Sequence, residues 1–370
     1  MSLTDQSKLS LPFLSGFIEE LNKSEKDVCD EILDEALKDK ILSLIFPVLQ
    51  LIATIDRKAI ERLHYALDNN ISNSYLYQGL GYGRIHERLE DKELAELLTK
   101  IAKNENGVDV AIDILHMRFH GVDPTKHDLS LIEVSQNIIM LYEFTRLRDN
   151  IRPYYLREVA EICIIGPNAS NVVSAICKKF VATYNAFNVY PYDYIDFLGL
   201  LARRQSKVFL DNFIGNNTIE DYQRSRLFSA NLERHENPLN QISDHDLISW
   251  CDVDPVSRYP LIAGVIVPFS QKNKTDKLTW KPIVSVILEN APDKDLIFAE
   301  LEDSVRPTSY MGKISDILET RLCLFEQLIS HENSEIAAWA RNAQSKLINS
   351  IEKAHIRENE SLRQENESFE

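Results

Sequence analysis

One helix-length segment, "DVAIDILHMRFHG", carries two carboxylates and two imidazoles at helical spacing. At about 100° per residue, Asp109, Asp113, His116 and His120 fall within a narrow arc of one helix face. Such a set could ligate a metal like zinc, which requires three or four ligands at about 2 Å. The other interpretation is a stripe that faces water, because the remaining residues of this helix are largely apolar.

The motif itself gives the metal interpretation little support. Two histidines four residues apart belong to the zinc-protease motif only as HExxH, and here Met117 stands in the position of the glutamate. We therefore predict that Asp109, Asp113, His116 and His120 form a solvated stripe, that they remain only weak metal candidates, and that the chain uses no cofactor.

Two His-Asp pairs resemble the HD pair of helical metal-dependent phosphohydrolases. In those enzymes an apolar residue, glycine and lysine usually follow, whereas His127-Asp128 is followed by "LSLI" and His245-Asp246 by "LISW". Ser243 or Asp244 is a good helix N-cap, and acidic residues in a first helical turn are favoured by the helix dipole. Capping is the predicted role of the second cluster, and a metal-dependent phosphohydrolase remains an alternative function.

The glycine-dense segment "QGLGYGR", from Gln78 to Arg84, is not a complete nucleotide-binding motif. A dinucleotide fingerprint requires a third glycine and a preceding strand, and neither is present. The chain also contains no GxxxxGK[ST] and no GxSxG sequence. We expect a turn or a close helix crossing at this segment.

A tyrosine-rich segment supplies the candidate partner-binding residues. "YNAFNVYPYDYIDF" gathers four tyrosines around Pro191, and two arginines follow in the next helix. Tyrosine and arginine are enriched at the energetic centres of protein interfaces. The alternative is ordinary packing of a helix start. The candidate anchors are Tyr190, Tyr192, Tyr194, Arg203 and Arg204.

The composition favours helices to hold these residues. Only 11 glycines and 13 prolines occur in 370 residues, and apolar residues recur at spacings of three and four. The formal net charge of −16 disfavours nucleic acid and anionic membrane surfaces as partners. Five widely spaced cysteines fit free thiols of a reducing compartment, and the most apolar run, Ile41 to Ile55, is too short to span a bilayer. We expect a cytoplasmic chain that has no membrane partner.

The C-terminal region shows the expected building unit most clearly. One apolar helix face runs from Ile314 to Ile329, and another from Ile336 to Ile351, with Trp339 beside it. Because only about four residues join the two helices, they must lie antiparallel, with Trp339 in their core. Successive helix pairs predict an all-α fold, specifically an α-solenoid of degenerate repeats; an irregular helical domain is the competing fold.

Polarity suggests where the chain divides. We expect an N-terminal helical-repeat array over residues 1–213, a polar connection or loop over residues 214–248, and a C-terminal array over residues 249–370. The last of these ends in a charged tail that either extends the final helix or frays.

Several segments together resemble a known class of proteins. These are "GVDVAIDILHMRFHG", "NPLNQISDHDLISWCDVDPVSRYPLIA", "WKPIVSVILENAPD", "SYMGKISDILETRLCLFEQLISHENSEIAAWARNAQSKL" and "RENESLRQENESFE". They resemble the C-terminal HEAT-like helical-repeat regions of large bacterial antiviral proteins, which often carry an NTPase module of the STAND or NACHT type. The similarity covers most of the chain beyond about residue 30. It includes no catalytic motif, and the NTPase and effector domains are missing here.

The resemblance implies that this region senses or binds a partner, such as a phage protein or another subunit of a defence system. The expected function is therefore a non-catalytic protein-binding module in a sensor or scaffold role. A second enzymatic alternative, besides the phosphohydrolase, is a HEAT-like DNA glycosylase. The charge of −16 argues against it, because DNA binding requires neutralisation of phosphates.

Overall fold

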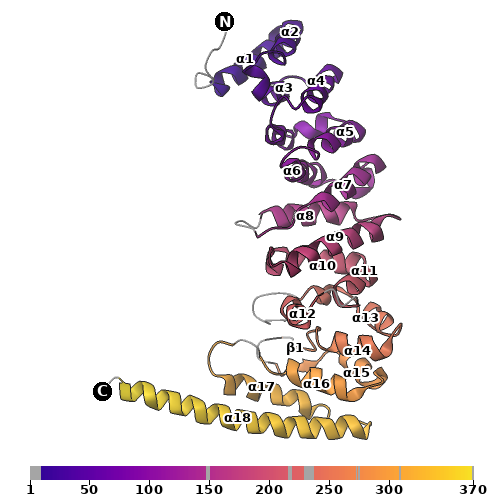
Figure 1. Cartoon of the computed structure of the whole chain (residues 1–370), viewed down its shortest axis with the longest axis vertical. Helices are drawn as coiled ribbons and strands as arrows, with labels where there is room; N and C mark the ends of the chain where they lie inside the picture. The colour runs from indigo at the N-terminus through magenta and orange to yellow at the C-terminus, as the bar shows by residue number, and fades with distance from the viewer. Residues whose placement is uncertain are drawn as a thin grey trace. The chain divides into compact units, whose positions relative to one another are not determined.

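The computed structural model describes residues 10–146, 151–215, 219–228, 237–271, 273, 276–307 and 310–368. Helices dominate these residues, which confirms the predicted all-α class (Figure 1). Two-residue strands, β1 (Phe269–Ser270) and β2 (Thr279–Trp280), pair antiparallel within the described part of the chain. Among the described helices, none has both the length and the apolar character required to cross a bilayer.

The chain divides into two compact units, Met1–Leu200 and Leu201–Glu370. The helices of unit 1 are α1 (Leu11–Ser24), α2 (Lys26–Ala36), α3 (Phe46–Ile52), α4 (Arg57–Asp68), α5 (Asp91–Ile101), α6 (Gly107–Phe119), α7 (Leu129–Leu141), α8 (Ile151–Cys163) and α9 (Ala169–Asn185). Short 3-10 helices join them: η2 (Leu42–Ile45), η3 (Ser74–Gly81), η4 (Ile85–Arg88), η5 (Pro124–Lys126) and η6 (Pro191–Tyr194). Helix α10 (Ile195–Arg204) crosses the boundary between the units.

Side-chain caps begin several of these helices. The carboxylate of Asp56 accepts a hydrogen bond from the backbone N–H of Ala59 at the start of α4. Asp128, the second member of an HD pair, accepts from the N–H of Ser130 and so caps α7. These bonds satisfy backbone donors that a first helical turn otherwise leaves unpaired.

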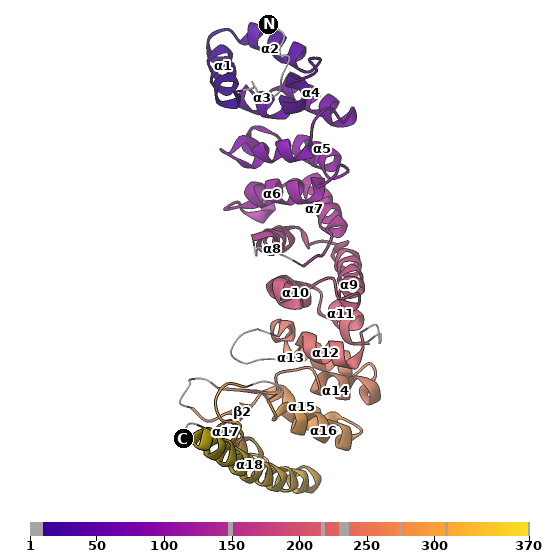
Figure 2. The ribbon, with the colours of Figure 1, turned by 60° about the vertical axis from the view of Figure 1, so that its left-hand side comes forward.

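Several helices of unit 1 contact the second helix after them. Helix α5 packs on α7, α7 on α9, and α6 on both η3 and α8. Figures 1 and 2 agree in placing α6 and α8 on one side of this unit and α5, α7 and α9 on the other. Elements η3, α6 and α8 therefore form one continuous row.

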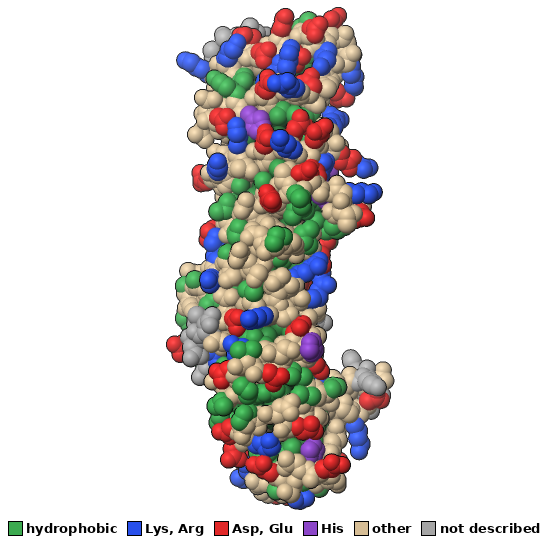
Figure 3. All heavy atoms as spheres, turned by 90° about the vertical axis from the view of Figure 1, so that its right-hand side faces the viewer, with side chains coloured by type: hydrophobic (Ala, Val, Ile, Leu, Met, Phe, Trp, Pro, Cys, Tyr) green, Lys and Arg blue, Asp and Glu red, His purple; other side chains and the backbone are tan. Residues whose placement is uncertain are grey.

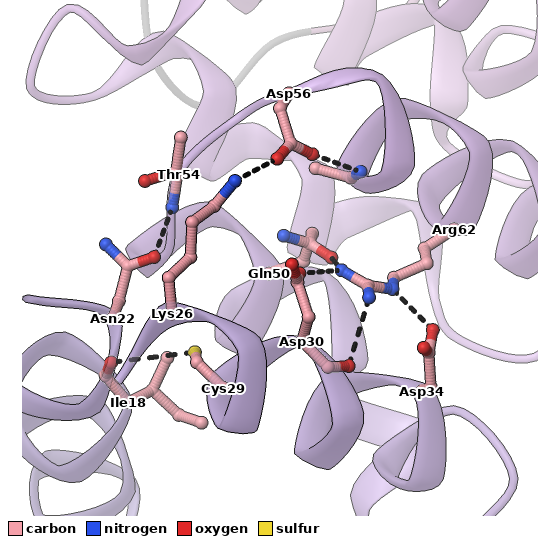
Figure 4. A network of polar contacts seen from close by, with 11 residues as sticks. Ile18, Asn22, Lys26, Cys29, Asp30, Asp34, Gln50, Thr54, Asp56 and Arg62 are labelled. Carbon is pink, nitrogen blue, oxygen red and sulfur yellow. Dashed lines mark hydrogen bonds and ion pairs between the residues drawn. The ribbon is translucent and has the colours of Figure 1, made fainter. Parts of the chain in front are cut away.

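A buried cation lies at the N-terminal end of unit 1 (Figure 4). The guanidinium of Arg62, only 6% exposed, donates from Nε to Asp34 Oδ1 at 2.7 Å and from Nη1 to Asp30 Oδ1 at 2.8 Å. Nη2 donates to the carbonyl oxygen of Asp30 at 3.0 Å, and Gln50 Oε1 lies 3.4 Å from Nη1. Arg62 thus ties α4 to α2 and α3 through bonds that occupy most of its donors.

Unit 2 contains further helices over its described residues. They are α11 (Ser206–Leu210), the π-helix η7 (Asp211–Gly215), α12 (Asp221–Phe228), η8 (Pro238–Gln241), α13 (Asp244–Cys251), α14 (Pro255–Ala263), α15 (Pro282–Asn290), α16 (Lys294–Ser304), α17 (Ile314–Glu326) and α18 (Ser334–Ser368).

The predicted polar connection, residues 214–248, is only partly described, because residues 216–218 and 229–236 lie outside the described residues. Its described part includes α12, whose Leu227 and Phe228 are buried, and the start of α13. Ser243 caps α13 by accepting from the N–H of Asp246, which confirms the predicted capping role.

The last two helices form the antiparallel pair that the sequence predicts. Ser315 near the start of α17 binds Glu358 late in α18, Glu319 binds His355, and Arg341 donates to the carbonyl of Ile329. Residue numbers thus rise along one helix as they fall along the other. Trp339 is only 7% exposed between them, which confirms its predicted core position, and the polar tail continues α18 as far as Ser368.

Candidate functional site

The stripe on α6 is only partly solvated. His116 is just 8% exposed, and its ring stacks on Tyr155 of α8, with centroids 4.0 Å apart. Asp113 is half-buried and Asp109 forms an ion pair with Arg152, so only His120 is fully exposed. The prediction of a solvated stripe is therefore wrong for His116. The arc faces η3 and α8, and helical spacing within α6 carries no information about these neighbours.

Burial shifts the pKa values of two residues of this stripe. Desolvation raises the pKa of the Asp113 carboxyl, and a hydrogen bond from Gln78 Nε2 to its Oδ2, 2.8 Å long, opposes that shift only in part. Desolvation lowers the pKa of His116, and the nearby His120 lowers it further, so the His116 ring is neutral at pH 7. Neither of its ring nitrogens has a hydrogen-bond partner among the described residues.

Over the described residues, the stripe on α6 does not form a metal site. No group of three or more His, Cys, Asp or Glu side chains there lies close enough to hold one ion. Instead, His116 stacks on Tyr155 and Asp109 pairs with Arg152, both on α8, whereas Asp113 accepts a hydrogen bond from Gln78 on η3.

Four tyrosines and a methionine surround the stripe on α6. Tyr75 lies on η3, Tyr82 directly follows it, Met117 projects from α6, and Tyr154 and Tyr155 begin α8. Their exposed fractions are 63% for Tyr75, 61% for Tyr82, 50% for Tyr154 and 37% for Met117. Burial raises the pKa of Tyr82, and the charges of Tyr75, Asp113 and Tyr155 add to this, so these groups are close neighbours. We call these five residues the tyrosine face.

Glycines allow η3 to lie against its neighbours. A Cβ atom on Gly79 would come within 2.9 Å of Leu51 Cδ1, whereas one on Gly81 would make only ordinary van der Waals contacts with Met117 and α6. Gly83 has a φ of +57°, a left-handed conformation that favours glycine. The "QGLGYGR" segment therefore combines the predicted turn and the predicted close crossing, and it presents Tyr75 and Tyr82.

A groove of about 500 Å³ runs beside the tyrosine face between η3, α6 and the start of α8. Its lining includes Tyr75, Gln78, Asp109, Asp113 and Arg152. Since Arg152 is paired with Asp109, Asp113 is the lining carboxylate without an opposing cation. The groove combines one aromatic ring, that of Tyr75, with one carboxylate that no cation of the lining pairs, which suits a cationic group.

The five residues predicted as partner-binding anchors differ in their exposure. Tyr194 is 1% exposed and its hydroxyl lies 3.2 Å from that of Tyr142, so it is a core residue and not a surface anchor. Tyr192 is 53% exposed and stacks on Tyr190, and the Arg146 guanidinium lies 4.7 Å from the Tyr190 ring centre. Arg203 and Arg204 are exposed at the end of α10 and belong to unit 2. Tyr190, Tyr192, Arg203 and Arg204 therefore stay predicted contact residues.

The first HD pair is part of a structural network. His127 packs edge-on against Phe119, and its Nδ1 lies 3.4 Å from Asp91 Oδ2. Asp91 also accepts from Arg118 and from the N–H of Asp128. His245 is exposed in the first turn of α13. Both pairs are thus explained by helix starts and local packing.

Figure 3 shows acidic and basic side chains interspersed over the N-terminal end of unit 1 on the face that it draws.

Comparison of the chain with protein-family models, with curated proteins and with solved structures finds no match. The function must therefore be inferred from the geometry of the site.

Sequence spacing identified the stripe on α6 but not the aromatic residues beside it. Tyr75 and Tyr82 come from one segment and Tyr154 and Tyr155 from another, and only the stacking of η3, α6 and α8 brings the two segments together. The available signal was local: "SYLYQGLGY" contains three tyrosines and "RPYYL" contains two.

Asp113 provides a test of this geometry through pH. Its pKa is raised in the folded chain, so folding is favoured when it is protonated, and this contribution is lost as pH rises from below 3.8 through the raised value. We expect Asp113→Asn to melt at a higher temperature than the wild type at pH 7, with the gain shrinking toward pH 4. Thermal melts followed by circular dichroism at several pH values measure this gain. A gain that does not change with pH would contradict the assigned environment.

Proposed function

We propose that this chain is a non-catalytic helical-repeat module that binds a protein partner, and that the tyrosine face is its contact surface. The observation that carries the proposal is the exposure of Tyr75, Tyr82 and Tyr154 on neighbouring elements. Tyrosines presented by packed helices lose little conformational entropy on binding and are frequent energetic centres of interfaces.

We propose a HEAT-like solenoid as the architecture of each unit. The contacts of α5 with α7, of α7 with α9 and of α6 with α8 support this for unit 1, since repeat arrays bury each helix pair against the next. In such an array, residues at equivalent places of successive helices form one extended surface. The tyrosine face, drawn from the neighbouring elements η3, α6 and α8, supports the proposal.

The chemistry of the groove favours a basic partner. The one cation of the groove lining, Arg152, pairs with Asp109 and not with Asp113, and tyrosine rings attract lysine and arginine side chains through cation–π contacts. The net charge of −16 adds a long-range field that attracts positive segments and repels acidic ones. We propose that the partner presents an arginine or lysine flanked by apolar residues.

The biological setting rests on the sequence resemblance alone. Similarity to the repeat regions of bacterial antiviral proteins supports a sensor or scaffold role in a defence system, with a phage protein or a defence subunit as the partner. In that setting, recognition by this chain would be coupled to an effector on another domain or subunit.

Selection from a random peptide display library, with the full chain as bait, tests the partner class. We expect the bound peptides to be enriched in arginine or lysine next to an apolar or aromatic residue. A bait carrying Tyr222→Ala serves as a control, because Tyr222 is 62% exposed in unit 2 and lies outside the tyrosine face. It should enrich the same peptides. Enrichment of acidic peptides would contradict the proposed partner.

A further inference from the structure

A second pocket lies in unit 2, where the chain between α16 and α17 meets the antiparallel pair α17 and α18. Its volume is about 640 Å³, within the range of small-molecule sites. The apolar side chains of Ile314, Leu318 and Ala354 contribute to its lining. Tyr310, which is 54% exposed, also lines it.

Four cations surround this pocket in a strongly acidic chain. Arg306 and Lys313 come from the segment that precedes α17, and Lys353 and Arg357 lie one helical turn apart on α18. Within the described residues, none of the four forms an ion pair with a carboxylate. The single acidic lining residue, Glu358, is engaged by the backbone N–H and hydroxyl of Ser315, at 3.1 Å and 2.6 Å.

This arrangement differs from ordinary surface charge on the same protein. Lys23, Lys38 and Arg57 each pair with a glutamate three or four residues away on their own helix or just beyond it. The four pocket cations instead come from two segments and face one cavity. Like charges placed together repel one another, and a bound anion removes that repulsion.

We propose that this pocket binds a small organic ligand that carries two or more phosphate charges. Lysine and arginine form strong charge-assisted hydrogen bonds with phosphate oxygens. The apolar lining and Tyr310 suit an uncharged organic part, and a planar ring can stack on the tyrosine. The chain contains no GxxxxGK[ST] loop, so the site is proposed to bind its ligand without hydrolysing it.

Isothermal titration calorimetry of the full chain with three probes tests the proposal. ADP combines two phosphates with a planar base, pyrophosphate lacks the base, and adenosine lacks the phosphates. We expect ADP to bind most tightly, pyrophosphate more weakly and adenosine not measurably. Binding of ADP should weaken as salt rises toward about 0.15 M, where charge interactions beyond about 8 Å are screened.

The location is tested by Lys353→Ala combined with Arg357→Ala, which should raise the Kd for ADP at least about tenfold. Arg57→Ala combined with Lys58→Ala removes the same charge from α4 in unit 1 and should leave the Kd unchanged. Circular dichroism confirms that both variants fold. The proposal is overturned if neither phosphate probe binds at low salt, if adenosine binds as well as ADP, or if both double variants weaken binding equally.

Discussion

Replacing Arg62 with alanine is expected to lower the free energy of unfolding of unit 1 by about 3–5 kcal/mol. Arg62 is almost fully buried, and its partners Asp30 and Asp34 are 16% and 55% exposed. Removal of Arg62 leaves the mostly buried Asp30 carboxylate unpaired, and the loss of one member of a buried ion pair has an effect of about this size, whereas the more exposed Asp34 is solvated by water. Urea unfolding followed by circular dichroism measures the change.

The matched control lies on the same helix. Arg57→Ala removes an exposed pair with Glu61, in which the arginine side chain is 92% exposed, and should shift stability by no more than about 0.5 kcal/mol. Equal effects of the two substitutions would show that Arg62 is not a buried tie between helices.

The Arg62 effect should also depend on pH. Burial alone would lower the pKa of Arg62, but its hydrogen bonds to Asp34 and Asp30 outweigh burial and raise it. The same guanidinium lowers the pKa of Asp34. A lowered carboxyl pKa stabilises the fold above pH 3.8 and loses that contribution as pH falls through the lowered value. The difference between wild type and Arg62→Ala should therefore shrink below pH 3.8.

Trp339→Ala is expected to destabilise unit 2 by about 3–5 kcal/mol, the usual range for removing a large buried aromatic. The indole stacks on Phe298 with centroids 4.6 Å apart, meets Phe325 edge-on at 5.6 Å, and donates from Nε1 to Glu302 at 3.0 Å. Truncation would leave a cavity between α16, α17 and α18 and would also remove the donor to Glu302.

Ile348→Ala on the same helix is the control for Trp339→Ala. Ile348 is 41% exposed, so its truncation should change stability by less than about 1 kcal/mol. Denaturant midpoints of the two variants compare them directly. A loss for Trp339→Ala no larger than that of the control would contradict its core position.

Local sequence rules predicted the helical class and one helix start. Spacings of three and four indicated helices, and Ser243 accepts the capping hydrogen bond at the start of α13 as expected. The pairing of α17 with α18 was also predictable, because a short connection leaves two helices no arrangement other than antiparallel.

The functional surface was less predictable because it depends on which helices become neighbours. Spacing placed Asp113 and His116 on one arc of α6, but the ring that covers His116 belongs to Tyr155, far along the chain. The prediction of Tyr194 as a surface anchor was wrong for the same reason, since its partner Tyr142 lies much earlier in the chain, directly after α7. One face of a helix can be read from its spacing, whereas the identity of what packs on it is a tertiary property.

The central claim is that the tyrosine face binds a basic protein segment, and one affinity measurement tests it most directly. The Kd of the full chain for the basic peptide best enriched by selection is measured for the wild type, for Tyr82→Ala combined with Tyr154→Ala, and for Tyr222→Ala. All three should fold alike, because the substituted side chains are at least half exposed. We predict that the double variant raises the Kd at least about 30-fold, the effect of losing one interface hot spot of about 2 kcal/mol, and that Tyr222→Ala leaves it unchanged. An unchanged Kd in the double variant would contradict the assignment of this face as the binding surface.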